Sequence, residues 1–451
     1  MGESGHPMQQ CEYWNHRWRL VVLWALSAVW LIGCSSNASV HRVGSSSVLG
    51  PLKVRSATQP DALTAFVNRF VGAMSLDDRI GQMMYAQFYC PSLAACVQHF
   101  HPGGMIVYSD VLNTYANSVS ITREAQANSV IPMIIGTDNE GGGEDRLTGF
   151  FPRHPTASSL AASGDPLYVY QQGVKMAKDN LAVGLNADLA PVVDLSGDSR
   201  DFSSDPATVI KYAGAWMQGL HDGGVIATLK HFPDYGASGP DPSNGCTNPH
   251  FCLPVLNHSH DTIESFDFAP YRALINSTDP PDMVMATDMM APALDSLPSV
   301  VSYQTITTVL RNELHFDGVV ISDSLYMGGL GEFFWHDPRP LTPFQQPGGP
   351  PPPPTDVILN HLPQLVIKAI KAGNDFILGP YITGIDTMTP TIAAIKAAIQ
   401  SGDLTEARIN QSVARIIRMK VLHGLIPFHP NSVPNAPQPQ YFTPAQMPIK
   451  P

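Results

Sequence analysis

The sequence predicts an α/β fold, a single (β/α)8 TIM-type barrel, from three observations. The chain has 451 residues, 44% of them hydrophobic, which is enough for one large core. Eight short segments are mostly apolar throughout, as expected for strands that are buried on both faces. Helical patterns separate these segments, as in barrels of alternating strands and helices. A doubly wound sheet is the main alternative, and eight strands suit it less well.

The predicted strands come at fairly regular intervals along the chain. They are 83–88, 104–108, 132–136, 187–193, 225–229, 283–286, 318–321 and 375–378. Two helices have clear start signals, since Asp165-Pro166 and Asp205-Pro206 each place a capping acid before a proline at the first helical position. After the second signal, apolar residues recur at helical spacing. They are Ile210, Ala213, Met217 and Leu220.

The first 34 residues are expected to be a lipoprotein signal peptide. Arg17 and Arg19 precede an apolar run over 20–33, which is shorter than the roughly 20 residues of a membrane-spanning helix. The run ends in Leu31-Ile32-Gly33-Cys34, which resembles the bacterial lipobox, where the cysteine is acylated. We therefore expect an exported protein that a lipid on Cys34 anchors to the membrane of the bacterial cell envelope.

The rest of the chain divides by composition. Residues 35–60 lack periodicity and are expected to be a flexible tether, 61–427 the barrel, and 428–451 a Pro-rich tail. Within the barrel, 338–354 contains Gly-Gly and a run of five prolines, which neither a helix interior nor a strand interior accommodates. We expect a surface excursion there.

Charge and cysteine content narrow the possible partners. The net charge is −12 and there is no dense basic run in the barrel, so a nucleic-acid partner is not expected. Beyond the signal peptide and Cys34, four cysteines form two closely spaced pairs, Cys90 with Cys96 and Cys246 with Cys252. Export permits disulfides, and two local bridges are the simplest of three connectivities. Neither pair is accompanied by Cys-x-x-Cys or clustered His, so a metal site is the weaker interpretation, and no metal or cofactor is expected.

Ionisable residues follow several predicted strands, where barrels of this kind carry their chemistry. They are Asp138, Glu140, Asp194, Lys230, His231, Asp288 and Asp323. Motifs around these positions, and at both ends of the barrel, resemble a known family. The matching segments are 75–83 (SLDDRIGQM), 102–104 (PGG), 136–142 (GTDNEGG), 189–194 (LAPVVD), 230–233 (KHFP), 318–325 (GVVISDSL) and 408–416 (RINQSVARI).

In these segments the chain resembles glycoside hydrolase family 3, and within it the single-domain β-N-acetylhexosaminidases, from about residue 74 to 424. The resemblance implies a carbohydrate substrate and the hydrolysis of terminal non-reducing β-linked N-acetylhexosamine (GlcNAc) from glycans, with cell-wall glycans as one source. It also implies a retaining mechanism, in which one carboxylate is the nucleophile and an acid protonates the leaving oxygen. Asp323 would be the nucleophile. The sugar would be bound by Asp138, Arg146, Arg200, Lys230 and His231.

The acid/base position departs from the family. Its loop normally continues from Lys-His-Phe-Pro to an Asp-Ser-His whose Asp and His form the proton-transfer dyad. Here Asp241 is in register, but Ser243 stands at the His position and cannot act as an acid at neutral pH. An inserted segment bounded by Cys246 and Cys252 contains His250. Two interpretations stay open: His250 replaces the missing His, or Asp241, Asp234 or no residue does the work.

Two other functions are therefore considered. A β-glucosidase or β-xylosidase of the same family would usually take its acid from a second domain, for which we expect no room in this chain, although 235–238 (YGAS) looks like the glucosidase loop. A catalytically impaired, sugar-binding lipoprotein is the other alternative.

Overall fold

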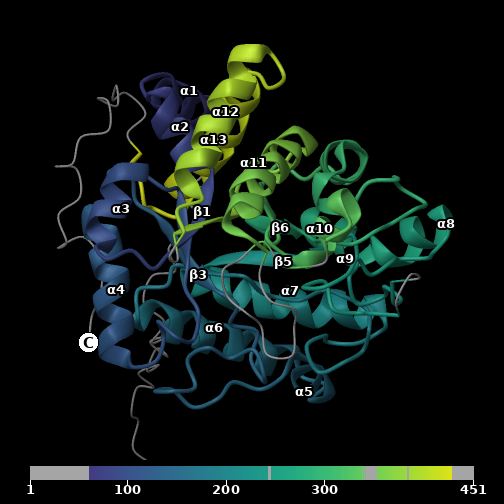
Figure 1. The fold of residues 1–451 in the computed structure, drawn as a ribbon. Coiled ribbons are helices and arrows are strands. Elements are labelled where there is room, and N and C mark those ends of the chain that lie inside the picture. The colour runs from purple at the N-terminus through teal and green to yellow at the C-terminus, as the bar shows by residue number, and fades with distance from the viewer. Residues whose placement is uncertain are drawn as a thin grey trace, which may run out of the picture. The chain divides into compact units, whose positions relative to one another are not determined.

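The computed structural model describes residues 60–241, 245–337, 339, 341, 353–382 and 385–428. All of them belong to the compact unit 52–451. Its strands form one parallel sheet in the order β7-β6-β5-β4-β3-β2-β1-β8 (Figure 1). They are β1 (Met84–Phe88), β2 (Gly104–Ile106), β3 (Ile134–Thr137), β4 (Ala187–Asp188), β5 (Ile226–Phe232), β6 (Met283–Ala286), β7 (Val319–Ser322) and β8 (Ile377–Ile382). A parallel bridge between Ile321 and Phe376 brings β7 to β8, so the TIM-type barrel is confirmed.

Helices separate the strands and cover the barrel. They are α1 (Pro60–Gly72), α2 (Leu76–Gln82), α3 (Leu93–Phe100), α4 (Tyr115–Asn128), α5 (Ala157–Ala162), α6 (Pro166–Ala182), α7 (Pro206–Asp222), α8 (His260–Thr262), η1 (Ile263–Asp267), α9 (Ala269–Ile275), η2 (Ser299–Val301), η3 (Gln304–Glu313), α10 (Gly328–Trp335), α11 (Thr355–Ala372), α12 (Met388–Ser401) and α13 (Glu406–Leu422). Both predicted helix starts are confirmed, because Asp165 accepts from the Leu167 amide and Asp205 from the Thr208 amide, each at 2.9 Å.

Most predicted strands differ from the observed ones at one or both ends, and two of these differences have a local cause in the backbone. The strand predicted over 187–193 ends at Asp188, because Pro191 has no N–H to donate. The chain still follows β5 beyond that point through a bridge between Val192 and Lys230. The eighth strand begins two residues later than predicted, because the amides of Asp375 and Phe376 both donate to the Val320 carbonyl.

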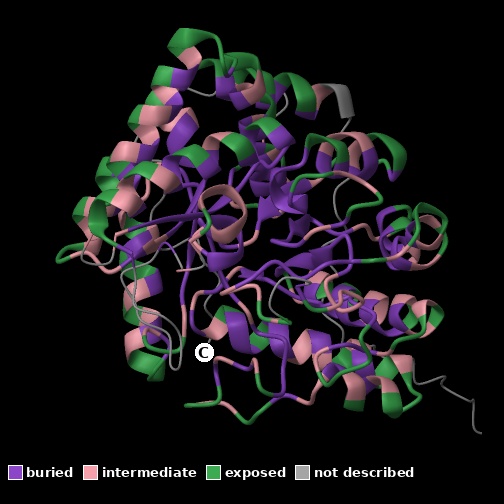
Figure 2. Cartoon of the chain, turned by 45° about the vertical axis from the view of Figure 1, so that its right-hand side comes forward, coloured by how far each residue is buried: buried purple, intermediate pink, exposed green. Residues whose placement is uncertain are grey.

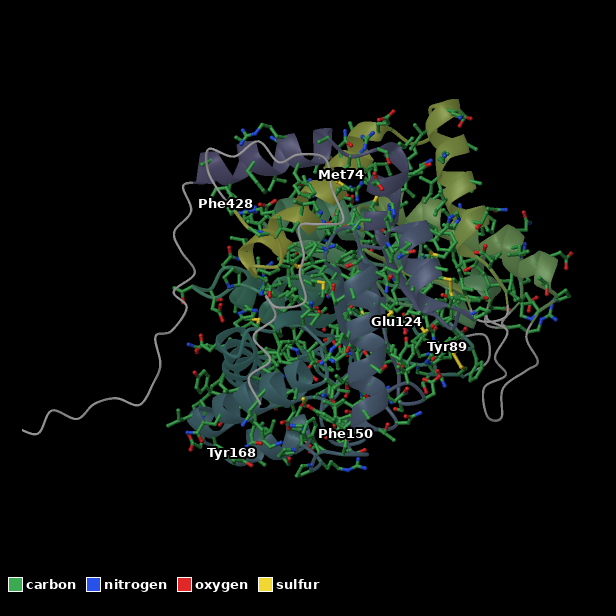
Figure 3. All side chains as sticks on the ribbon, turned by 90° about the vertical axis from the view of Figure 1, so that its left-hand side faces the viewer. Met74, Tyr89, Glu124, Phe150, Tyr168 and Phe428 are labelled. Carbon is green, nitrogen blue, oxygen red and sulfur yellow. A yellow bond between two sulfur atoms is a disulfide. The ribbon has the colours of Figure 1, made fainter. Side chains whose placement is uncertain are left out.

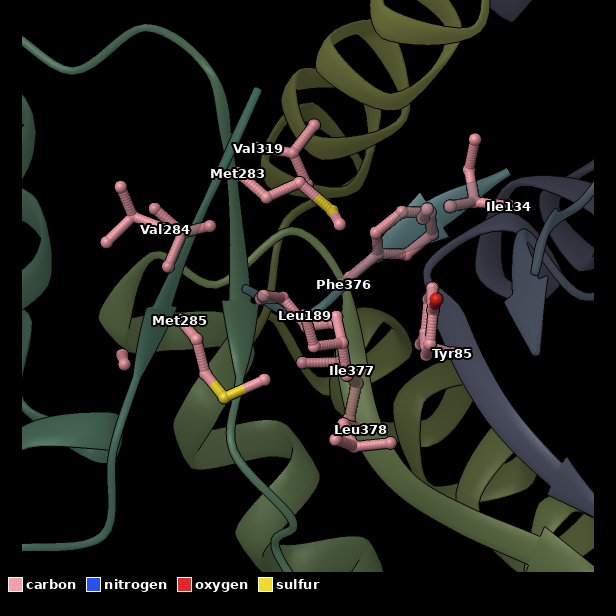
Figure 4. Packing of buried hydrophobic residues seen from close by; sticks show 14 of the residues in the cluster. Tyr85, Ile134, Leu189, Met283, Val284, Met285, Val319, Phe376, Ile377 and Leu378 are labelled. Atoms are coloured by element: carbon pink, nitrogen blue, oxygen red, sulfur yellow. The ribbon is translucent and has the colours of Figure 1, made fainter. Parts of the chain in front are cut away.

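Apolar side chains fill the centre of the barrel, and the exposed residues lie on the outer helix faces (Figure 2). Figure 4 shows Met283, Met285 and Leu189 turned toward the same interior as Phe376. The rings of Tyr85 and Phe376 meet edge-on, with centroids 5.2 Å apart. The interior is therefore a packed core, which leaves the strand ends as the place for a site.

Helix α13 is held to the barrel through Asp375, two residues before β8. Ser412 donates to this buried carboxylate at 2.7 Å, and Arg415 lies 3.4 Å from it. Arg408 donates to Ser412 and to the Asn374 carbonyl, each at 2.7 Å. The Arg-and-Ser pattern of the last motif thus secures the final helix on the face away from the catalytic strand ends.

Two observations concern residues at the expected domain boundaries. Helix α1 begins at Pro60, the last residue of the predicted tether. Phe428, the first residue of the predicted tail, packs edge-on against Phe66 of α1 with centroids 5.3 Å apart, and Figure 3 labels it. The predicted signal peptide, the tether up to 59, most of 338–354 and the tail from 429 lie outside the described residues. In the part of the chain that is described, no helix combines the length and apolarity needed to cross a membrane.

Candidate active site

Asp323 follows β7 directly and is half-buried. Its backbone amide donates to the Ala286 carbonyl of β6 at 2.8 Å, which fixes its position between two strands. Each carboxyl oxygen accepts one hydrogen bond, Oδ1 from the Ser324 amide at 2.7 Å and Oδ2 from the Thr287 hydroxyl at 2.9 Å. The donors orient the carboxylate, and lone pairs are left over for an attacking role.

Lys230 lies at the centre of a charged network across the ends of β3 and β5. Its ammonium is 2.6 Å from Asp138 and 2.7 Å from Glu140. Arg200 binds Glu140 through two parallel bonds of 2.8 and 2.9 Å. Burial acts to raise the pKa of Glu140, but the charges of Lys230 and Arg200 outweigh it and lower that pKa. Glu140 is therefore charged at neutral pH, and the exposed part of the network can hold hydroxyl groups through charge-assisted bonds.

His231 is oriented by a carboxylate of the neighbouring strand end. Its Nδ1 donates to Asp194 at 2.7 Å, and its amide donates to the same residue at 2.9 Å. This pairing sets the protonated nitrogen and leaves Nε2 for another partner. The ring of Tyr235 packs edge-on against His231, with centroids 5.6 Å apart.

Arg146 has a different local partner. Its guanidinium lies 2.5 Å from Glu144, and its amide donates to Asn139 at 3.1 Å. Glu144 belongs to the segment 143–145 that alters the family spacing. The described contacts of Arg146 thus bring it to its own loop and not to the Lys230 network, and its sugar-binding role stays a prediction.

The loop after β5 carries the residues considered for proton transfer. The structure contains the two local bridges, Cys90–Cys96 and Cys246–Cys252. The loop closed by the second bridge rests on the start of α10, where the Gly328 amide donates to the His250 carbonyl at 2.8 Å. A Cβ on Gly329 would lie 2.3 Å from the Cys252 carbonyl oxygen, so this close approach requires glycine. Helix α10 begins five residues after Asp323, so the loop is attached to the helix that follows the predicted nucleophile.

His250 is half-buried in this loop. Burial lowers its pKa, and the charges of Asp323 and Asp138 act in the opposite direction. His250 is thus within electrostatic reach of both carboxylates of the candidate site, although it lies more than 70 residues before the first and more than 100 after the second in the sequence.

The two alternative acids bind the backbone of the same loops. Asp241 is buried, its amide donates to the Cys246 carbonyl at 2.7 Å, and its carboxylate accepts from the Leu253 amide at 3.4 Å. Asp234 is also buried and accepts from the Leu195 and Ala237 amides, each at 3.1 Å. Burial and the charge of Asp194 raise the pKa of Asp234.

Two tyrosines that the sequence reasoning missed lie near the nucleophile. Tyr108 and Tyr326 share a hydrogen bond, and burial followed by neighbouring charges, including Asp323 and Asp138, raises the pKa of Tyr108. No motif marked them. Glu140, Asp194 and Thr287 were also not assigned roles, although the first two stand in quoted motifs and the third directly follows a predicted strand.

Two cavities open at this end of the barrel. One of about 170 Å³ is lined by Asp194, Arg200, Asp201 and Tyr235 among others. The other, of about 390 Å³, lies at the ends of β1 and β2. Its lining includes Tyr89 and Glu124, which Figure 3 shows on the same side of the molecule. The smaller cavity adjoins the charged network and His231, which makes it the nearer of the two to the predicted sugar-binding groups.

A TIM barrel whose strand ends present an oriented carboxylate beside a Lys-carboxylate-Arg network has the parts of a glycoside hydrolase. The chain belongs to glycosyl hydrolase family 3, since the N terminal domain of that family matches residues 75–419.

Named relatives agree with this assignment. The chain is 27% identical over 426 residues to beta-hexosaminidase LpqI of Mycobacterium tuberculosis, covering 89% of this chain and 97% of the relative. It is 26% identical over 363 residues to beta-hexosaminidase A of Pseudoalteromonas piscicida, covering 73% of this chain but only 55% of the relative. The solved structure of a family 3 beta-N-acetylglucosaminidase from Paenibacillus sp. str. FPU-7 superposes with a TM-score of 0.66 at 25% identity, covering 78% of this chain and 63% of that one.

Proposed function

We propose that this protein hydrolyses terminal non-reducing β-linked N-acetylhexosamine from glycans by a retaining mechanism with Asp323 as nucleophile. The observation that carries the proposal is the half-buried Asp323 carboxylate, held by Thr287 and Ser324 at the same barrel end as the Lys230 network. The names of the hexosaminidase relatives support the choice of sugar.

The chemistry has two steps. In the first, an oxygen of Asp323 attacks the anomeric carbon, the bond to the leaving oxygen breaks, and an acid gives that oxygen a proton. In the second, water attacks the same carbon, the bond to Asp323 breaks, and the water's proton returns to the acid/base group. Asp138, Lys230, His231 and Arg200 hold the ring in place, with Arg146 at the margin of the site.

The acid/base group is proposed to be His250. The attachment of its loop to α10, together with the charge of Asp323 acting on its pKa, supports this role. Asp241 is the alternative, and its hydrogen bonds within the loop favour a supporting part in the loop's shape. A proton donor with a lowered pKa suits an enzyme that works best below neutral pH.

Export and membrane attachment are also proposed, with a lipid on Cys34. The support is the lipobox-like sequence at the end of an apolar run, which lies outside the described residues. One acyl chain binds membranes only weakly, so stable attachment requires more than one chain. A Cys34→Ala protein should lose membrane association or remain unprocessed, and unchanged fractionation and mobility would contradict the proposal.

The activity is tested by assaying the purified full-length chain on aryl β-glycosides of N-acetylglucosamine, glucose and xylose. We expect turnover of the N-acetylglucosaminide to exceed the other two. A preference for the glucoside or xyloside would support the other activity of the family. Binding of N-acetylglucosamine without turnover of any substrate would support a sugar-binding protein instead.

A further inference from the structure

Asn139 separates the two carboxylates that bind Lys230. The Lys230 ammonium lies 2.6 Å from Asp138 and 2.7 Å from Glu140. Side chains two residues apart point to one face where a chain is extended, and the residue between them points to the other face. Asn139 is fully buried and contacts helix α6, where its Nδ2 donates to Asn180 at 2.9 Å. The anchoring of Asn139 therefore bears on the position of both carboxylates.

Two further hydrogen bonds connect Asn139 and Asn180 to the end of β4. The Asn139 backbone amide donates to Oδ1 of Asp188 at 3.1 Å. Asn180 donates through Nδ2 to Oδ2 of the same carboxyl group at 3.0 Å. Asn139, Asn180 and Asp188 thus form a closed hydrogen-bonded triangle. All three residues are fully buried, so water does not compete for these bonds.

The direction of the bonds in the triangle follows from one backbone group. The Arg146 amide donates to Oδ1 of Asn139 at 3.1 Å, and a backbone N–H cannot accept. Asn139 must therefore donate through Nδ2 to the oxygen of Asn180, and this leaves Nδ2 of Asn180 to donate to Asp188. Asp188 is thus required to accept on both of its oxygens. A carboxyl group can do so, whereas a carboxamide has one oxygen only.

The bonds to Asp188 do not depend on its charge. Burial raises the pKa of Asp188 to about 8, although its two hydrogen bonds and the charge of Lys230 act to lower it. A carboxyl oxygen can accept a hydrogen bond in either protonation state. The sheet fixes the position of Asp188, because it pairs with Thr137 of β3, two residues before Asn139. The triangle therefore attaches the Asp138 segment to the sheet at neutral pH.

We propose that Asp188 is a positioning residue for sugar binding, which holds Asp138 in place through the triangle. This inference rests on the proposed function, in which Asp138 binds the sugar ring. Asp138 is a partly exposed member of the charged network, with 22% of its side chain exposed against 3% for Glu140. A displacement of the segment would therefore reach a bound sugar through Asp138. Asp188 itself has no exposed surface with which to contact a substrate.

Exchanging the side chains at 180 and 188 tests the proposed direction of the bonds. In Asp188→Asn the new Nδ2 faces either Nδ2 of Asn180 or the Asn139 amide, so one bond is lost. We expect KM for an aryl β-N-acetylglucosaminide to rise about 10-fold, the effect of roughly one hydrogen bond, while kcat changes little. The double variant Asp188→Asn/Asn180→Asp restores every donor and acceptor at the same net charge. Its KM should return close to the wild-type value.

A double-mutant cycle tests whether the effect passes through Asp138. In an Asp138→Ala protein, Asp188→Asn should have little further effect on kcat/KM, because the group that it positions is gone. Asn186→Asp is the matched control at the opposite end of the same two strands. Asn186 accepts from the Ile135 amide at 2.7 Å and donates to the Met133 carbonyl at 3.0 Å. The control should lower the unfolding temperature and leave KM unchanged.

The outcomes separate this inference from the proposed function. With an active wild type, an unchanged KM in Asp188→Asn would overturn the positioning role alone. An equal fall in kcat/KM with and without Asp138, or a folded double exchange that does not recover KM, would also overturn it. If Asp188→Asn does not fold, Asn180→Ala interrupts the same triangle and is judged by the same cycle.

Binding of N-acetylglucosamine covers the case of an inactive wild type. A wild type that binds this sugar without cleaving any aryl glycoside would overturn the proposed hydrolysis, and the same variants are then compared by their affinity for the sugar. A wild type that neither binds nor cleaves would overturn the proposed function and this inference with it.

Discussion

The Gly328 amide donates a hydrogen bond of 2.8 Å to the carbonyl of His250. This bond joins the loop closed by Cys246 and Cys252 to the helix that follows Asp323. The loop is thus attached to the segment that carries the nucleophile. Substitutions that displace the loop can therefore be compared with a substitution that removes its candidate proton donor.

Asp323→Asn should lower kcat by roughly 10⁴–10⁶-fold, as the loss of a covalent nucleophile does in other enzymes. The fold should persist, since the amide oxygen can still accept from the Ser324 amide while the amide nitrogen can donate to the Thr287 hydroxyl oxygen. Asp317→Asn is the control, because that carboxylate is exposed and pairs with Arg418 at 2.7 Å. Kinetics with an aryl substrate and trapping with a fluorinated sugar check the prediction. Labelling of a different carboxylate would reject it.

His250→Ala should slow substrates with poor leaving groups far more than substrates whose phenol departs without a proton. The acid form must be present, so in the wild type kcat/KM for poor leaving groups should fall as pH rises through the pKa of His250, which burial places below its ordinary value. His260→Ala, at the start of α8, is the control. If Asp241→Ala shows the leaving-group contrast and His250→Ala does not, Asp241 is the donor.

Gly329→Ala should displace the loop, since its Cβ would lie 2.3 Å from the Cys252 carbonyl oxygen. We expect a selective loss of activity on poor leaving groups, in the same direction as His250→Ala but smaller. Gly72→Ala introduces the same methyl group where no atom lies within 4 Å and should leave activity unchanged. Wild-type behaviour of Gly329→Ala would show that the loop's contact with α10 does not position the donor.

Replacing Cys246 and Cys252 together by serine should reduce activity on poor leaving groups as well as stability. A bridge that closes so short a loop contributes roughly 2 kcal/mol on the chain-entropy account. The Cys90/Cys96 double serine variant is a matched control with the same sequence separation of 6, and it should lower stability alone. Equal kinetic effects in the two pairs would argue against a special role of the second bridge.

His221 should contribute to stability in a pH-dependent way. It lies 2.8 Å from Asp279 and 3.0 Å from Asp282, and burial, which lowers its pKa, is outweighed by these charges, which raise it to about 9. The contribution is fully present below the unfolded pKa of roughly 6.5 and is lost as pH rises through about 9. Its size is on the order of 3 kcal/mol. Urea unfolding of His221→Gln should therefore differ from wild type at pH 6 and converge above pH 9.

The sequence alone was sufficient to predict the barrel fold and the end of the barrel at which the candidate catalytic residues lie. Strand and helix periodicities are local properties, so eight apolar segments and two Asp-Pro caps predicted the order of elements without any knowledge of contacts. The position of Asp323 after the seventh strand followed from the same pattern, because parallel strands in a barrel end on one face. The strand ends were predicted less well, and Pro191 and the Val320 carbonyl, which accepts from two amides, are two places where local hydrogen bonding moved them.

Tertiary structure alone decided which groups pair. The altered spacing at 143–145 set Arg146 apart from Arg200, but the motifs did not show that Arg200 binds Glu140 across two loops while Arg146 binds Glu144 in its own loop. Likewise, the sequence placed Asp288 at a strand end but could not show that it is buried with no hydrogen-bond partner among the described residues, nor that the charge of Asp323 acts on the pKa of His250. These relationships depend on distances between segments that are remote in the chain, and side-chain pairing and burial are set only when the barrel brings those segments together.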